Sequence, residues 1–110
     1  MTRRVRIVAA LALAGVATAC ARESGVVHHR LEIADLVFRP EEAVVAPGDT
    51  VTWINRDLVP HTVTAADESG DSGALTGAAP FSCVAQPGDS VRYVCRYHPT
   101  MSGVLVVAAR

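Results

Sequence analysis

Residues 93–103 read Tyr-Val-Cys-Arg-Tyr-His-Pro-Thr-Met-Ser-Gly, which places a thiol, an imidazole and a thioether at intervals of three residues. Apolar β-forming residues precede this segment and follow it at 104–107, so the pattern predicts a strand, a tight loop and another strand. A loop of this length can direct Cys95, His98 and Met101 toward one point. These donors suit copper, which favours two imidazoles and one thiolate in a trigonal plane with a long axial thioether.

The second imidazole has to come from another part of the chain. His61, within the segment Leu-Val-Pro-His-Thr-Val at 58–63, is the candidate. Taken singly, Cys95, His61, His98 and Met101 have simpler explanations, as a buried thiol, two loop histidines and a core methionine. Their joint occurrence at this spacing favours a site for one copper ion held by all four.

These segments resemble the small blue-copper proteins, the cupredoxins, and among them the amicyanins, which have the same short Cys-to-His-to-Met spacing. The sequence Thr-Trp-Ile-Asn-Arg-Asp at 52–57, followed by Pro-His-Thr-Val at 60–63, is similar to the region of the family's first ligand. The resemblance extends over residues 30–109. It implies a Greek-key antiparallel β-sandwich and a single type 1 copper ion that carries electrons by cycling between Cu(II) and Cu(I). The family's four ligands match His61, Cys95, His98 and Met101.

The resemblance also implies roles for residues beside the ligands. Asn55 is expected to tie the His61 loop to the Cys95 loop by hydrogen bonds. Thr62 stands where the family commonly has Asn, and its backbone N–H is expected to donate to the Cys95 sulfur, which would tune the reduction potential. Arg96 and Tyr97 replace smaller residues of the amicyanins, so the identity of the partner does not carry over.

His98 is expected to be the ligand nearest to solvent, with apolar side chains around it. The expected apolar residues are Leu58, Val59, Pro60, Pro99 and Met101. A flat apolar patch over a ligand edge lets a redox partner approach without binding tightly. We therefore predict a monomer that docks a dehydrogenase, cytochrome or oxidase at this patch.

The first nineteen residues predict an export signal. They contain a basic start, an apolar stretch over 7–16 and small residues before Cys20. Two outcomes are compatible with Cys20: simple secretion, or acylation of its thiol as a membrane anchor. We predict a signal peptide at 1–19, a tether at 20–26 and one cupredoxin domain at 27–110. The location would be the periplasm or the outer face of the cytoplasmic membrane.

Composition excludes some functions. All ten basic residues are arginine, and removal of residues 1–19 leaves seven of them against eleven acidic residues, a formal charge of −4. No basic patch is evident, which argues against nucleic acid as a partner. Contact with a membrane is expected only through a lipid on Cys20.

Cys83 remains without an assigned role; we interpret it as a small buried hydrophobic residue, with a Cys83–Cys95 disulfide as the less favoured alternative.

The strand pattern predicts an all-β fold. Seven or eight short segments alternate apolar and polar residues, and Pro-Gly turns at 47–48 and 87–88 separate them. We expect strands near 26–36, 43–46, 50–54, 62–64, 79–84, 90–95 and 103–108, a turn at 38–40, and Trp53 in the core. This pattern is typical of an antiparallel sandwich with crossed connections.

One other function remains as an alternative. A copper storage, delivery or sensing protein could use the same fold and ligands. An enzyme is not expected, because a second metal site would need further histidines and only His28 and His29 remain.

Overall fold

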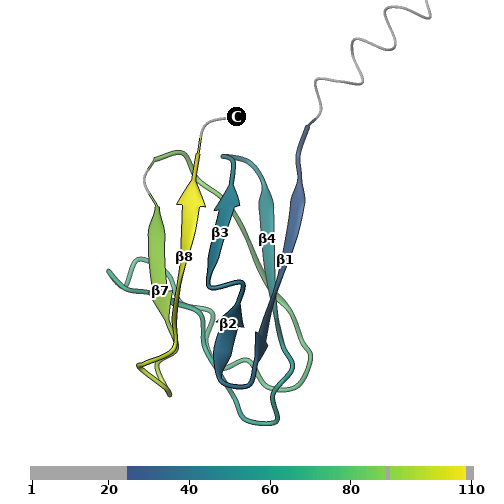
Figure 1. Ribbon diagram of the computed structural model, residues 1–110, viewed down its shortest axis with the longest axis vertical. Coiled ribbons are helices and arrows are strands. Elements are labelled where there is room, and N and C mark those ends of the chain that lie inside the picture. Colours follow the sequence, from purple (N-terminus) through teal and green to yellow (C-terminus); the bar gives the residue numbers. More distant parts are fainter. Residues whose placement is uncertain (1–24, 89, 109–110) are drawn as a thin grey trace, which may run out of the picture.

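The computed structural model describes residues 25–88 and 90–108 of the chain. These residues form strands and no helix, and the strands make two sheets (Figure 1). The strands are β1 (His28–Ala34), β2 (Val37–Arg39), β3 (Glu42–Val45), β4 (Thr50–Asn55), β5 (Thr64–Ala65), β6 (Phe81–Val84), β7 (Val91–Val94) and β8 (Ser102–Val107). The predicted signal peptide and Cys20 lie outside the described residues. Within the described part there is no apolar helix of a length that could span a membrane.

The two sheets each have four strands, in the orders β2-β1-β4-β6 and β3-β8-β7-β5. Only the β1–β2 and β7–β8 connections join neighbours in one sheet, and every other connection passes from one sheet to the other. The predicted all-β sandwich is therefore confirmed. The sheets are mixed rather than wholly antiparallel, because β1 pairs in parallel with β4 and β3 pairs in parallel with β8. A connection that crosses between sheets leaves the next strand free to run in either direction.

The strand directions define two ends of the sandwich. β1 starts at the end where residue 25 lies, and β4 runs beside it in the same direction, with His28 opposite Thr50 and Ile33 opposite Asn55 (Figure 1). β7 runs antiparallel to β8, which in turn is parallel to β3. The loops that follow β4 and β7 consequently meet at the end of the sandwich away from residue 25.

The core lies between the sheets and follows the alternation in the sequence. Trp53 and Val51 are buried on one face of β4, and Leu31 and Ile33 are buried on the neighbouring β1. A fully buried aliphatic or aromatic side chain of this size contributes about 1.5–3 kcal/mol. The prediction that Trp53 is a core residue is confirmed. The buried cluster consists of Leu31, Ile33, Phe38, Val45, Val51, Trp53, Val63, Leu75, Ala85, Tyr93, Cys95, Met101 and Leu105.

One strand occupies a segment for which the sequence predicted a turn. Residues Val37–Arg39 form β2, which pairs antiparallel with β1 through Ile33 and Phe38. Phe38 is buried, and its ring meets the Tyr93 ring edge to face at a centroid distance of 4.8 Å. Three residues are too few to show an alternating pattern, and Pro40 directly after them is a turn signal. The burial of Phe38 explains why the segment is a strand.

Gly103 has a packing role in β8. It lies opposite Tyr93 of β7, and the Tyr93 ring lies over it. A Cβ atom at position 103 would come within 2.5 Å of the ring carbon and the oxygen of the Tyr93 hydroxyl. The ring is also held by Trp53, at a centroid distance of 5.4 Å, and by Phe38. A side chain larger than that of glycine at position 103 would therefore force the Tyr93 ring to shift.

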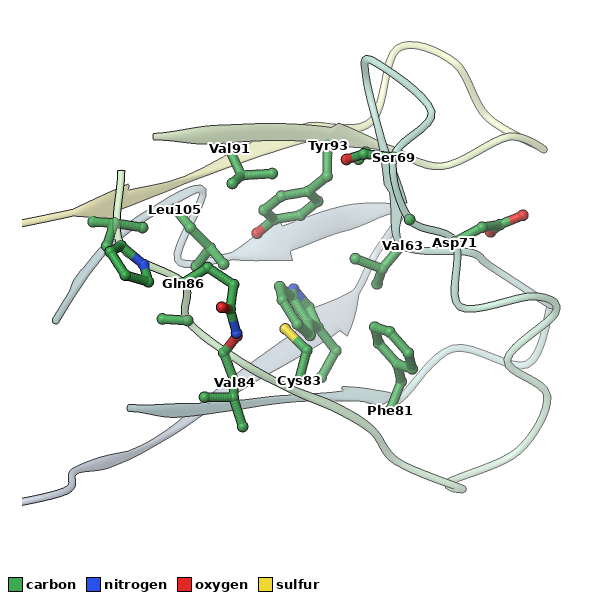
Figure 2. A pocket seen from close by; sticks show the side chains of 16 residues that line it. Val63, Ser69, Asp71, Phe81, Cys83, Val84, Gln86, Val91, Tyr93 and Leu105 are labelled. Atoms are coloured by element: carbon green, nitrogen blue, oxygen red, sulfur yellow. The ribbon is translucent and has the colours of Figure 1, made fainter. Parts of the chain in front are cut away.

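A cavity of about 370 Å³ opens between the sheets beside β6 and β7 (Figure 2). Cys83 and Tyr93 are among the residues that line it, and none of the predicted metal donors is. Within the described residues, Trp53 Nε1 and the Tyr93 hydroxyl are buried without a hydrogen-bond partner. Burial raises the pKa of Tyr93, and the nearby indole N–H of Trp53 partly opposes that rise, although the two groups do not reach bonding geometry.

Cys83 differs from the prediction in its degree of burial. Its side chain is half-buried and lines the cavity instead of filling the core. Burial nevertheless raises the pKa of the Cys83 thiol, so the thiol stays protonated at neutral pH. Both Cys83 and Cys95 are free, which excludes the disulfide alternative.

Candidate metal centre

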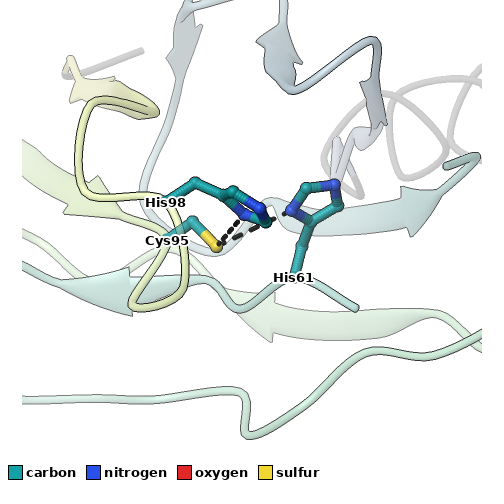
Figure 3. A group of neighbouring side chains, drawn as sticks. All are labelled: His61, Cys95 and His98. Atoms are coloured by element: carbon teal, nitrogen blue, oxygen red, sulfur yellow. Dashed lines mark hydrogen bonds between the residues drawn. The ribbon is translucent and has the colours of Figure 1, made fainter. Parts of the chain in front are cut away.

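Three of the predicted donors, His61, Cys95 and His98, converge on one point (Figure 3). The Cys95 Sγ atom lies 3.7 Å from His61 Nδ1 and 3.7 Å from His98 Nδ1. The ligand atoms of all three residues lie within 4.8 Å of one another. His61 comes from the loop after β4, while Cys95 and His98 come from the loop between β7 and β8.

These distances fit one metal ion bound in a plane. A metal ion typically lies about 2.0 Å from an imidazole nitrogen and about 2.3 Å from a thiolate sulfur. At a nitrogen–metal–sulfur angle of about 120°, these bonds place the nitrogen about 3.7 Å from the sulfur. Both observed separations have this value. A thiolate with two imidazoles in this arrangement is the donor set of a type 1 copper site. The sulfur–nitrogen separations therefore already suit a shared ion, and the ligand atoms of all three residues lie within 4.8 Å of one another.

Two backbone hydrogen bonds shape the loop at 95–101. The Met101 N–H donates to the His98 carbonyl at 2.8 Å, and the Cys95 N–H donates to the Met101 carbonyl at 3.2 Å. They close a tight loop in which Cys95 and His98 point to the same side (Figure 3). Met101, the last residue of this loop, is buried in the core cluster.

The backbone on both sides of His61 is fixed by a bridge to Leu75. The His61 N–H donates to the Leu75 carbonyl at 3.2 Å, and the Leu75 N–H donates back to the His61 carbonyl at 2.7 Å. The side chain of His61 is completely buried. An imidazole without access to solvent keeps one orientation, which is needed to aim Nδ1 at the thiol.

Asp57 is a site residue that the sequence analysis missed. Its Oδ2 atom lies 2.8 Å from His61 Nε2, the ring nitrogen that faces away from Cys95. Burial alone would raise the pKa of Asp57, but hydrogen bonds from the Leu36 N–H, from His61 and from the Asp35 N–H together hold that pKa below its ordinary value. The sequence signal for it is an aspartate four residues before the histidine.

Thr62 joins the two loops of the site. Its backbone N–H lies 3.4 Å from the Cys95 sulfur as a donor, in the arrangement that the resemblance implied. Its hydroxyl oxygen also accepts a hydrogen bond of 2.9 Å from the Arg96 backbone N–H. One residue after His61 thus contacts the Cys95 loop through both its backbone and its side chain.

Asn55 does not make the link that was expected of it. Among the described residues, its amide donates to the carbonyls of Val59 and Leu75, each at 2.9 Å, and its side-chain oxygen accepts from the Asp57 N–H at 2.8 Å. All three bonds hold the His61 loop itself rather than the Cys95 loop. The cross-link belongs to Thr62 because its short hydroxyl points at the Arg96 backbone.

The donors differ in their access to solvent. His61, Cys95 and Met101 are buried, whereas His98 is partly exposed, as predicted. Of the residues expected around it, Leu58, Val59, Pro60 and Pro99 are exposed. Met101 is buried in the core cluster, so it does not belong to the expected apolar collar.

Comparisons with known proteins agree with this geometry. The family model described as copper binding proteins, plastocyanin/azurin family, matches residues 26–108. Amicyanin from Paracoccus denitrificans is 34% identical over 82 residues, a match that spans 70% of this chain and 63% of that protein. Amicyanin-alpha from Methylorubrum extorquens is 27% identical over 104 residues, 90% of this chain and 87% of that protein.

Solved structures give the same result for the fold. The reduced form of an amicyanin point mutant superposes with a TM-score of 0.70 at 28% identity, covering 80% of this chain and 89% of that one. The matched region contains His61, Cys95 and His98, whose ligand atoms are arranged for one copper ion.

Proposed function

Because the chain belongs to the plastocyanin/azurin family of copper-binding proteins, and not to a class of enzymes, we propose that it is a type 1 copper electron carrier. The observation that carries the proposal is the equal 3.7 Å separation of the Cys95 sulfur from the His61 and His98 nitrogens. Bound there, a copper ion would supply one-electron chemistry by changing between Cu(II) and Cu(I).

The residues around the donors favour rapid electron transfer because they restrain the ligands in both oxidation states. Hydrogen bonds fix the His61 backbone to Leu75 and close the 95–101 loop on itself. With copper bound, the hydrogen bond from the Thr62 N–H to the Cys95 sulfur would favour Cu(I) and raise the potential. Met101 would be the fourth residue to hold the ion, on its position in the loop.

We also propose that the domain works outside the cytoplasm. The basic, apolar and small-residue segments of residues 1–19 support export, and Cys20 directly after them supports a lipid anchor as a second form of the mature protein. The expected location is the periplasm or the outer face of the cytoplasmic membrane. A mass measurement of the mature N-terminus distinguishes a free Cys20 from an acylated one.

A carrier and a storage or delivery protein predict different results for the copper-loaded mature domain. A carrier should show an intense visible band from the Cys95 thiolate, and mixing its oxidised and reduced forms should average the NMR signals of residues near the site. A storage or delivery protein needs neither property. A domain that binds copper without the band, or with separate NMR signals for the two forms, would contradict the proposal.

Electrons are proposed to pass through the partly exposed edge of His98. The exposed side chains of Leu58, Val59, Pro60 and Pro99 would form the docking patch for the redox partner. Leu58 is fully exposed and Val59 is exposed to 43%. A patch this apolar supports transient contact with the apolar face of another redox protein.

Replacing Val59 with Glu should slow electron self-exchange between two copies by about tenfold. Two like charges would meet when the patches dock, and the loss of about 1.5 kcal/mol of apolar contact corresponds to about a tenfold change. The visible band should be unchanged, because the Val59 side chain is exposed and is not a donor. The measurement is NMR line broadening in mixtures of the oxidised and reduced forms.

The matched control is Val44→Glu. Val44 is exposed to 61% and lies on β3, outside the metal loops. It should leave self-exchange unchanged. Equal slowing by both variants would show that overall charge, and not the patch, controls the rate.

A further inference from the structure

We infer that Asp57 is a positioning residue of the copper site, and that its carboxylate links His61 to the turn between β1 and β2. The inference depends on the proposed function, in which His61 binds the ion through Nδ1. Asp57 does not touch the ion's position; it acts through the imidazole. No other carboxylate among the described residues is within bonding distance of His61 or His98.

The first part of the argument is the state of the His61 ring. An ionised carboxylate can only accept hydrogen bonds, so His61 Nε2, at 2.8 Å from Asp57 Oδ2, has to carry the proton. The other nitrogen, Nδ1, then keeps a free lone pair and faces the Cys95 sulfur at 3.7 Å. His61 is completely buried, and Asp57 is the acceptor that its Nε2 atom reaches.

The second part is what holds Asp57 itself. Its Oδ1 atom accepts from the Asp35 N–H at 2.7 Å, and Oδ2 accepts from the Leu36 N–H at 3.0 Å. Asp35 and Leu36 both have positive φ angles, 55° and 63°, which residues other than glycine adopt rarely. The carboxylate therefore stabilises an unfavourable turn, and the turn in turn fixes the carboxylate under the imidazole.

The third part of the argument concerns the number of hydrogen bonds that Asp57 accepts. The three N–H donors, on Asp35, Leu36 and His61, together use both oxygens of the carboxylate. The Asp57 backbone is also fixed, because its N–H donates to the Asn55 side chain. An asparagine at position 57 has one acceptor oxygen, and its NH₂ group would face at least one of the three N–H donors. Aspartate is the residue of this length that can satisfy His61, Asp35 and Leu36 together.

The expected consequence is electronic as well as geometric. A carboxylate bonded to the far nitrogen makes a metal-bound imidazole a stronger donor, and its negative charge favours the more highly charged ion. Removing it should weaken Cu(II) binding more than Cu(I) binding. Loss of such a partner typically lowers metal affinity by about 10- to 100-fold. A tenfold loss confined to Cu(II) raises a one-electron potential by about 59 mV.

The test compares Asp57→Asn with Leu36→Gly in the full copper-loaded protein. Leu36→Gly keeps the backbone N–H that donates to Asp57 and relieves the positive φ angle, so the carboxylate keeps its hydrogen bonds and its place beside His61. Voltammetry should show a raised potential in Asp57→Asn and an unchanged potential in Leu36→Gly. Titrations with Cu(II) and Cu(I) should show that Asp57→Asn loses Cu(II) affinity preferentially.

Two further measurements keep the result interpretable. If Asp57→Asn alone folds poorly, the double variant Leu36→Gly/Asp57→Asn is measured against Leu36→Gly, because glycine removes the strain that the carboxylate offsets. Asp57→Glu, which keeps the charge, should restore part of the potential. An Asp57→Asn protein with lowered stability but an unchanged potential and an unchanged Cu(II) preference would overturn the inference. A wild-type protein without the thiolate band would instead refute the proposed function.

Discussion

Cys95→Ser is expected to abolish the intense visible band of the copper-loaded protein and to lower its Cu(II) affinity by more than about 100-fold, the upper range for losing only an outer hydrogen-bond partner of a ligand. The Cys95 sulfur is the one donor that contacts both imidazole nitrogens. A serine hydroxyl stays protonated at neutral pH and is a hard, weak donor, whereas the thiolate is soft and charged. Absorption spectra during Cu(II) titration give both quantities.

Cys83→Ser is the matched control for this prediction. Cys83 is the other cysteine of the described domain, and it lines the cavity beside β6 with its thiol protonated. Its replacement should leave the band and the Cu(II) affinity intact, at a cost of about 1 kcal/mol in stability. If Cys83→Ser removed the band and Cys95→Ser kept it, the assignment of the thiolate would be wrong.

Gly103→Ala should destabilise the domain strongly, because Gly103 is the described glycine at which an added Cβ would meet other atoms within 4 Å. The new Cβ would lie 2.5 Å from the Cζ atom and the hydroxyl oxygen of Tyr93, so the ring would have to shift against the Trp53 and Phe38 rings that it contacts. Overpacking of this kind costs about 3 kcal/mol. That is a large part of the 5–15 kcal/mol or so that stabilises a typical domain. Urea unfolding of the copper-free protein measures the change without the contribution of the metal.

Gly70→Ala provides the comparison for the same chemical change. Nothing lies within 4 Å of a Cβ built at position 70. The substitution should stabilise the domain slightly, by about 0.4–1 kcal/mol, because it restricts the unfolded chain. If Gly103→Ala lowered the free energy of unfolding no more than Gly70→Ala does, the Tyr93 ring would have to move aside at no cost.

The features that the sequence predicted are those that local spacing controls. Cys95 and His98 are three residues apart in one loop, so their convergence follows from the chain itself. Alternation likewise identified the buried faces of β1 and β4, with Leu31, Ile33, Val51 and Trp53 in the core. The copper family followed from the same residues.

The features that the sequence did not predict depend on contacts between distant segments. The parallel pairing of β1 with β4 leaves no local trace, and β2 was too short for its pattern to outweigh Pro40. Asn55 and Thr62 were both polar residues near His61, and only the geometry shows that Thr62 makes the link to the Cys95 loop. Asp57 was missed because its partners, Asp35 and Leu36, lie more than twenty residues away.

The direction of β1 determines which way the domain faces when it is held from its N-terminal side. β1 starts at the end of the sandwich where β8 finishes, and the partly exposed edge of His98 is at the other end. A membrane anchor attached before residue 25, such as a lipid on Cys20, would therefore hold the domain at the end opposite to His98. The exposed edge of His98 would then face away from the membrane, toward redox partners that diffuse freely or belong to neighbouring complexes.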